Sequence, residues 1–340
     1  ARMYTLCTFL IMLSSYYLVK ALEGSKNRYW LGYVIATAAG LYTHYFLVFS
    51  KAAQGIFIIL YVLKYGRFKS LLAASMAYGL AILLYVPWFG IFLEQFGRVQ
   101  ENYWIPAMNR WSVPSTIWKM VSGGQGIRNQ VLLVAAIASV FLIGYFIKKV
   151  SNFQKWHVAL GVLVPFIGAV VISWKTNLYL DRYFVFASLY FTILIIAALY
   201  RIHNWPIRWL LIIALAGGTV FAFFKNWKDL NIADKPGMAA ASAYINQSTR
   251  PGDKIFVGSS FIFFTFKYYN KTSIEPLLIS SGPLRTIPHF SGTAILTNDD
   301  LILDISKAQK NSTVWLLWTT GFGGSKPQVP ANWKQLDEQG

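Results

Sequence analysis

The sequence predicts a polytopic all-α membrane domain of about eight helices, followed by a small α/β domain outside the membrane. Three observations support this fold class. The 340 residues are 56% hydrophobic and only 13% charged, whereas about a quarter of the residues of a soluble domain are charged. The apolar residues form long blocks, which is typical of membrane-spanning helices. Short basic segments separate these blocks.

Most apolar blocks have the length of one membrane crossing, since a hydrocarbon core of about 30 Å needs about 20 helical residues. The blocks cover 3–22, 30–63, 70–90, 130–147, 157–174, 183–200 and 208–224. The block 30–63 is too long for one crossing, because a helix of this length would extend about 51 Å. We therefore expect it to break once, between Gly40 and Lys51, and to form a hairpin.

Four short loops between the blocks are strongly basic and define the expected topology. They contain eleven Lys or Arg residues and one acidic residue, Glu23, and they cover 20–28, 64–69, 148–155 and 201–208. By the positive-inside rule all four are cytoplasmic, so the hairpin tip lies outside. The segments 91–129 and 175–182, and everything after residue 224, are then outside as well.

The net charge of +18 does not by itself indicate a nucleic-acid partner. Part of it lies in the short cytoplasmic loops, and no RNA- or DNA-binding motif is present. We expect membrane lipids around the chain and no nucleic acid bound to it.

The chain changes character after the last apolar block, so we divide it into a membrane domain (1–224) and an outer domain (225–340). A helix followed by a Pro-Gly-Asp turn leads into a predicted strand at Lys254–Val257. Further strands are predicted at 276–280 and 313–319, and a helix at 298–310. Strands that alternate with helices indicate a small α/β domain.

Two candidate site regions lie at predicted outer helix ends. Arg2 and Tyr4 begin the first helix, where they either anchor it at the interface or line a site. His44 and Tyr45 lie at the hairpin tip. Polar residues at membrane depth usually face a bundle interior or a water-filled cavity. His44 could ligate a divalent metal, bind a phosphate, or donate a hydrogen bond to another helix, or it could be purely structural.

Lys51 and Gln54 follow the hairpin tip at a spacing that places them on one helix face. Lys51 either extends to the interface or holds an anion. The outer segment 91–129 is long enough to suggest an ordered re-entrant or interfacial segment with a function. Its Trp104 is a candidate for stacking on a sugar, with an aromatic interfacial belt as the alternative.

The last candidate region precedes the helix at 183–200. It contains Lys175, Asp181, Arg182 and Tyr183. Asp181 and Arg182 could pair locally. Two cations, Lys175 and Arg182, converge where a lipid phosphate would lie, and Arg is the usual bidentate phosphate ligand.

These stretches together carry a resemblance to a known family. They are "ARMYTL" at the start of a helix, "GLYTHYF" in the hairpin, "YWIP" in the outer segment, "DRYFVFASLYF" before a late helix, and "PGMAAASAYINQSTRPGDKIFV" after it. Their order and placement resemble the dolichyl-phosphate-mannose-protein mannosyltransferase-like proteins. In bacteria these are the family 39 glycosyltransferases of the GT-C fold.

The resemblance implies a hexosyl or pentosyl transferase of the cell envelope, in the bacterial cytoplasmic membrane with the last domain outside. It would move a sugar from a polyprenyl-phosphate donor to a lipid, glycan or protein acceptor. The general base of such enzymes is an Asp, or an Asp-Glu pair, in the first outer loop. The resemblance places that loop upstream of Ala1, so we expect no catalytic residue in these 340 residues and no activity from them alone.

The resemblance also implies roles for individual residues. Arg2, Tyr4, His44 and Tyr45 would line the outer cavity, and Arg182 with Tyr183 would bind the donor phosphate. Some GT-C enzymes use a divalent metal, for which His44 is the candidate ligand. Lys51 is not part of the family pattern.

Two alternatives from other functional classes stay open. One is a lipid-linked-sugar transporter or flippase, which should show inverted repeats and broken helices at the midplane; the sequence shows no internal repeat. The other is a non-catalytic membrane scaffold. An Asp or Asp-Glu in a first outer loop would favour the enzyme over the scaffold.

Overall fold

The computed structural model describes residues 3–24, 26–101, 105–123, 128–229, 237–287, 292, 295–308, 312–319 and 326–338. The chain divides into two compact units. The first comprises Ala1–Leu93 and Trp104–Asp229, and the second comprises Glu94–Tyr103 and Leu230–Gly340. The first unit is helical, and the second contains a small parallel sheet.

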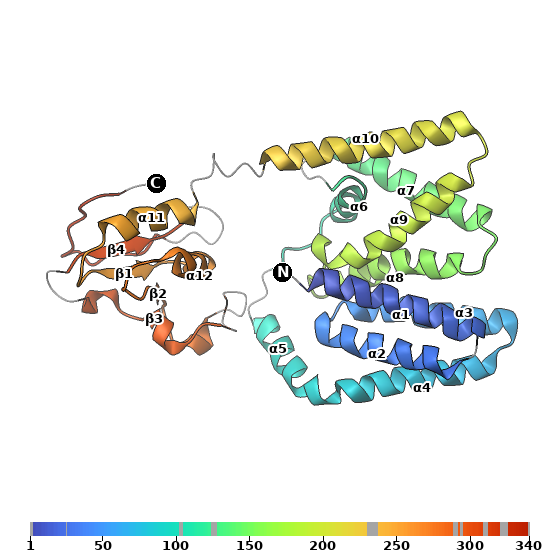
Figure 1. Ribbon diagram of the computed structural model, residues 1–340, viewed down its shortest axis with the longest axis horizontal. Coiled ribbons are helices and arrows are strands. Elements are labelled where there is room, and N and C mark those ends of the chain that lie inside the picture. The colour runs from blue at the N-terminus through green and yellow to red at the C-terminus, as the bar shows by residue number, and fades with distance from the viewer. Residues whose placement is uncertain are drawn as a thin grey trace. The chain divides into compact units, whose positions relative to one another are not determined.

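The first unit is a helical bundle (Figure 1). Its helices are α1 (Tyr4–Gly24), α2 (Asn27–Thr43), α3 (Leu47–Tyr65), α4 (Phe68–Tyr85), α6 (Ser112–Ser122), α7 (Asn129–Lys149), α8 (Lys155–Ser173), α9 (Val185–Tyr200) and α10 (Trp205–Asp229). Among the described residues, seven helical segments are long and apolar enough to cross a membrane. Helix α2 is shorter than these seven, at 17 residues.

The predicted break in the block 30–63 is confirmed. Helix α2 ends at Thr43 and α3 begins at Leu47, so the turn between them falls inside the expected interval. The chain reverses there tightly: a Cβ on Gly40 would lie 2.2 Å from a methyl carbon of Leu47. The absence of a side chain at Gly40 therefore lets the two helices approach each other at the tip.

Two buried apolar clusters hold the bundle together. One includes Leu18, Tyr33 and Phe57 and joins α1, α2, α3 and α4, which lie side by side in Figure 1. The other includes Ile11 and Phe166 and joins α1, α3, α8 and α9. The faces of α4, α7 and α10 are largely exposed, and between 6% and 17% of their apolar segments is buried. Exposed apolar faces of this extent are what a lipid environment requires.

The segment 91–129 is more regular than its sequence suggested. The apolar stretch does not end at residue 90 but continues as Phe68–Gly97. It bends at the short 3-10 helix η1 (Val86–Trp88), where Pro87 lies, and continues as α5 (Phe89–Glu101). Helix α6 then packs against α7 and α10.

The second unit contains a four-stranded parallel sheet in the order β3-β2-β1-β4. Its elements are α11 (Met238–Ser248), β1 (Lys254–Val257), α12 (Ser260–Tyr269), β2 (Leu277–Ile279), η4 (Leu284–Thr286), η6 (Asn298–Asp300), β3 (Leu301–Ile302), η7 (Ile305–Lys307) and β4 (Val314–Leu317). The structure confirms the three predicted strands and the helix before the first one. Helix α12 was not anticipated; its start is marked by Ser259, whose side chain accepts a hydrogen bond from Phe261 N–H.

The helix predicted at 298–310 is wrong. In its place are a single 3-10 turn, the short strand β3, and a second 3-10 turn. Leu301 and Ile302 pair in parallel with Leu278 and Ile279 of β2. Thr297 and Asp300 cap a single turn here, but pairing with the sheet takes the following apolar residues out of the helical conformation.

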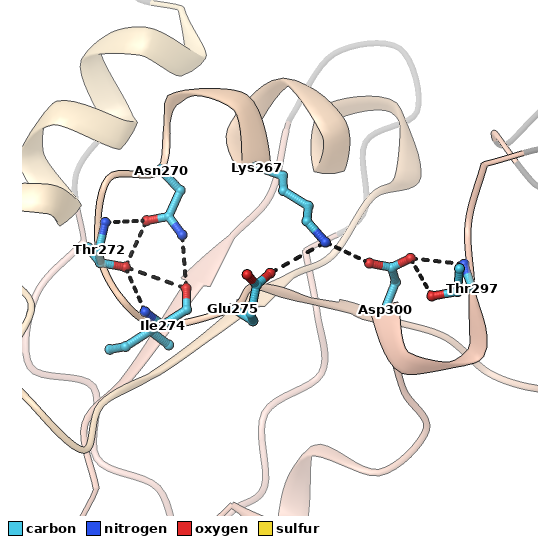
Figure 2. Close-up of polar contacts among 7 residues, drawn as sticks. All are labelled: Lys267, Asn270, Thr272, Ile274, Glu275, Thr297 and Asp300. Atoms are coloured by element: carbon cyan, nitrogen blue, oxygen red, sulfur yellow. Dashed lines mark hydrogen bonds and ion pairs between the residues drawn. The ribbon is translucent and has the colours of Figure 1, made fainter.

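Lys267 of α12 links that helix to Glu275, just before β2, and to Asp300, just before β3, as Figure 2 shows. Its ammonium lies 2.9 Å from Asp300 Oδ1 and 3.4 Å from Glu275 Oε2. Asp300 Oδ2 also accepts hydrogen bonds from the Thr297 N–H and hydroxyl. Burial opposes ionisation of Asp300, but these hydrogen bonds and the ammonium outweigh it and lower the pKa of the carboxyl group.

Candidate functional site

Three of the predicted site residues meet at one end of the bundle. The Tyr4 ring lies 5.3 Å from the His44 ring and 6.3 Å from the Tyr183 ring, and the His44 and Tyr183 rings are 5.4 Å apart. The three come from the start of α1, the α2–α3 turn, and the 3-10 helix η2 (Asp181–Phe184). Phe46 supports them, with its ring 4.5 Å from Tyr183. We call Tyr4, His44 and Tyr183 the aromatic cluster.

His44 is oriented by its own turn. It follows the last residue of α2 in an extended conformation, and its Nδ1 accepts a hydrogen bond of 3.1 Å from Phe46 N–H. Burial lowers the pKa of His44 below its usual value. An imidazole that accepts through Nδ1 and is neutral carries its proton on Nε2. His44 is therefore arranged to donate one hydrogen bond.

This tautomer bears on the predicted metal ligand. A ring nitrogen that carries a proton has no lone pair for a metal. Within the described part of the chain, no group of three or more His, Cys, Asp or Glu side chains could hold a metal ion. A metal at His44 stays a prediction, and it would require the ring to give up the Phe46 contact, because Nδ1 of a neutral metal-bound imidazole carries either the metal or the proton.

Arg182 lies beside the aromatic cluster, with its guanidinium carbon 5.9 Å from the centre of the Tyr183 ring. The turn that carries it is held by Asp181. One oxygen of Asp181 accepts the Arg182 N–H at 2.8 Å, and the other contacts the Lys119 ammonium of α6. The sequence suggested a local pair of Asp181 and Arg182. Their hydrogen bond is donated by the Arg182 backbone N–H, and Asp181 forms an ion pair with Lys119, 62 residues earlier.

The other predicted site residues are placed differently. Tyr45 is 40% exposed and packs edge-on against Phe92, 5.0 Å away between ring centres. Lys175 is exposed in the turn after α8 and takes part in none of the ring contacts of the cluster. Arg2 and Trp104 lie outside the residues that the structure describes. Their predicted roles stay predictions.

A second polar group, which we call the Lys51 network, is buried inside the bundle. The Lys51 ammonium donates to Ser14 Oγ at 2.6 Å and to Gln54 Oε1 at 2.8 Å. It also lies 4.9 Å from the centre of the Tyr33 ring. Gln54 Nε2 donates to Ser14 and Ser15, and Tyr33 OH donates to Gln54 Oε1. No described carboxylate forms an ion pair with Lys51.

The expectation that Lys51 extends to the interface is wrong, because the residue is only 6% exposed. The hydroxyl oxygen of Ser14 and the amide oxygen of Gln54, both inside the bundle, supply the acceptors that the interface would otherwise provide. The alternative, that Lys51 holds an anion, stays a prediction. The network continues through Ser15, whose hydroxyl lies 2.6 Å from Tyr190 OH. Beside Tyr190, the buried His157 ring has no hydrogen-bond partner on either nitrogen among the residues that the structure describes.

Comparison with known proteins places the chain in no family. No family model matches it, and no curated protein or solved structure is significantly similar to it.

The residues of the site themselves indicate which ligands it can bind. The aromatic cluster and Arg182 combine half-buried ring faces, one neutral imidazole N–H and one guanidinium at a helix-end turn. Such a set can bind a phosphate through the guanidinium and pack a sugar or lipid against the rings. The cluster itself contains no carboxylate, and the neighbouring Asp181 is engaged by Lys119 and by a backbone N–H.

Proposed function

We propose that the protein is an integral-membrane glycosyltransferase that moves a sugar from a polyprenyl-phosphate donor to an acceptor on the extracytoplasmic face. One observation carries the proposal. Tyr4, His44 and Tyr183, which the family resemblance selected from three distant stretches, lie within 6.3 Å of one another between ring centres. Arg182 lies beside them.

The setting supports the same proposal. The cluster lies where three apolar segments, Tyr4–Gly24, Leu47–Tyr65 and Asp181–Tyr200, begin. A long isoprenoid chain needs such an apolar surface next to a site for its phosphate. The positive-inside rule assigns this end to the outer face, and it assigns the second unit to the same side. The proposed location is the bacterial cytoplasmic membrane.

The proposed reaction is an inverting displacement at the anomeric carbon. A bond forms between the acceptor oxygen and that carbon, and the bond from the carbon to the donor phosphate oxygen breaks. A carboxylate takes the proton of the acceptor hydroxyl, as it does in the family that the chain resembles. The electron pair leaves with the polyprenyl phosphate, whose charge Arg182 is positioned to stabilise.

Donor profiling tests the proposal. The full-length protein is reconstituted in liposomes with defined polyprenyl-phosphate hexoses and pentoses. We expect transfer from at least one of them to an acceptor. Movement of an intact lipid-linked sugar across the bilayer, without transfer, would contradict the proposal and identify a transporter. If neither transfer nor movement is detected, the non-catalytic scaffold is the better account.

A further inference from the structure

Helix α6 is attached at two points to the segment that leads into the site. The Lys119 ammonium contacts Asp181 Oδ2, and Thr116 Oγ1 accepts a hydrogen bond of 2.9 Å from the buried Tyr179 hydroxyl. Thr116 and Lys119 are three residues apart, so they lie on the same face of α6. The segment 179–183 is thus held against one helix face.

The carboxylate of Asp181 transmits this attachment to Arg182. Its Oδ1 accepts the Arg182 N–H at 2.8 Å while Oδ2 contacts Lys119. The Tyr183 N–H then donates to the carbonyl of Leu180 at 3.0 Å, which closes the turn. Because the carboxylate fixes the peptide between Asp181 and Arg182, it fixes the direction in which the Arg182 side chain starts.

Stability alone is a weak explanation for this ion pair. The side chains of Lys119 and Asp181 are 30% and 33% exposed, and ion pairs near the surface contribute little to stability. A positioning role agrees better with the structure, because α6 itself is anchored. Val113, Ile117 and Met120 of this helix pack against the buried cluster that contains Phe184. Lys119 therefore projects from a fixed helix toward the turn.

We propose that Lys119 is a positioning residue, which through Asp181 fixes the turn that presents Arg182 and Tyr183 to an anionic ligand. This inference rests on the proposed function, in which the ligand is the phosphate of the donor. Recognition of a phosphate by a guanidinium depends on a fork of two parallel hydrogen bonds. A small displacement of Arg182 therefore weakens donor binding more than it affects the acceptor.

The kinetic test compares Lys119→Met with Lys119→Arg, which keeps the ion pair, and with Lys148→Met, an exposed lysine outside the site. With the full-length protein and a polyprenyl-phosphate donor, Lys119→Met should raise the donor KM about fivefold or more. The acceptor KM should stay within about twofold, and Lys119→Arg should stay near wild type. A variant that merely folds less well would lower the apparent kcat and leave both KM values unchanged. That result, or an equal rise in the donor KM with Lys148→Met, would overturn the inference.

A second readout does not depend on the reaction. Hydrogen exchange of the amides in 181–184 should be about fivefold faster in Lys119→Met than in wild type, with exchange in α8 unchanged. Unchanged exchange in the turn would overturn the inference even if the enzyme were active. If the wild-type protein transfers no sugar, the proposed function fails, and faster exchange in the turn would still support the positioning role of Lys119.

Discussion

The ammonium of Lys51 lies 2.6 Å from the hydroxyl oxygen of Ser14, in the interior of the bundle and without a carboxylate partner among the described residues. Gln54 supplies the second acceptor and also connects Ser15 and Tyr33. A buried amino group is costly when its hydrogen bonds are incomplete, whether it is charged or neutral. The stability of the first unit should therefore depend on Gln54 more than on Lys51.

Gln54→Leu should lower the free energy of unfolding by about 2–4 kcal/mol, because it removes an acceptor from the buried Lys51 amino group and leaves other polar groups unpaired. Adding Lys51→Met should restore at least half of the loss, since the buried amino group that lost its acceptor is then gone. Thermal unfolding in detergent measures both. Gln154→Leu, which removes an exposed contact to Glu23, serves as the control, with a change below about 0.5 kcal/mol. No recovery in the double variant would contradict this account of the network.

His44 should matter to its turn through Nδ1. His44→Leu removes the acceptor of the Phe46 N–H and should cost about 1 kcal/mol. His44→Asn should retain most of the stability, because an Asn side-chain oxygen accepts from the N–H two residues on. Equal losses in the two variants would show that the turn does not depend on this hydrogen bond.

Protonation of His44 should make the stability of the folded state depend on pH. The pKa of His44 is lowered in the folded protein, so the unfolded chain takes up the proton first as the pH falls below about 6.5. The folded state therefore loses stability toward lower pH. Unfolding measured between about pH 7 and pH 5 should show a smaller loss for His44→Asn than for wild type. Parallel curves would contradict the assignment of a neutral His44.

Asp300 should stabilise the second unit mainly through its turn. Lys267 is 40% exposed along its side chain, so its ion pair adds little, whereas the Thr297 hydrogen bonds form a capping box. Asp300→Ala should cost about 1–2 kcal/mol. Hydrogen exchange in β2 and β3 of the full chain measures the loss. Asp299→Ala changes the exposed neighbour and should have no effect on exchange.

The contribution of Asp300 also depends on pH. Its pKa is lowered in the folded state, so its contribution is complete above the unfolded value of about 3.9 and disappears as the pH falls through the folded value. The difference between wild type and Asp300→Ala should therefore be constant near neutral pH and decrease below about pH 4, after correction for intrinsic exchange rates. A difference that grows toward low pH would contradict the assigned sign.

The predicted topology is tested by thiol labelling in a Cys7→Ala background. Tyr45→Cys, at the exposed hairpin tip, should react with a membrane-impermeant maleimide added to intact cells. Ser151→Cys, in a predicted cytoplasmic loop, should react only after permeabilisation. The reverse pattern would place the site on the cytoplasmic side and exclude the proposed reaction.

The helical bundle was predictable because its signals are local. Block length required the hairpin break between α2 and α3, and the strand β1 followed a Pro-Gly-Asp turn. The segment 298–310 was not predictable in the same way, since the pairing of Leu301 with Leu278 decides its conformation. Local capping signals can start either a helix or a single turn, and pairing with the sheet determines which of the two forms.

In the candidate site too, some features could be predicted from the sequence and others depend on tertiary packing. The sequence selected Tyr4, His44 and Tyr183 through a resemblance, and the structure brings them together. The sequence did not indicate that Lys119 contacts Asp181, because that contact depends on how α6 packs. Lys51 and Gln54 were expected on one face, but the acceptor Ser14 comes from another helix.

The proposed function is tested most directly by sugar transfer in one assay with three forms of the full-length protein. These are wild type, Arg182→Ala, and Arg201→Ala as a matched arginine variant in a predicted cytoplasmic loop. With a polyprenyl-phosphate sugar donor, Arg182→Ala should lower the rate about tenfold or more, because the leaving phosphate loses its cation, while Arg201→Ala stays within about twofold of wild type. A wild-type rate for Arg182→Ala, or no transfer by wild type from any such donor, would contradict the proposal.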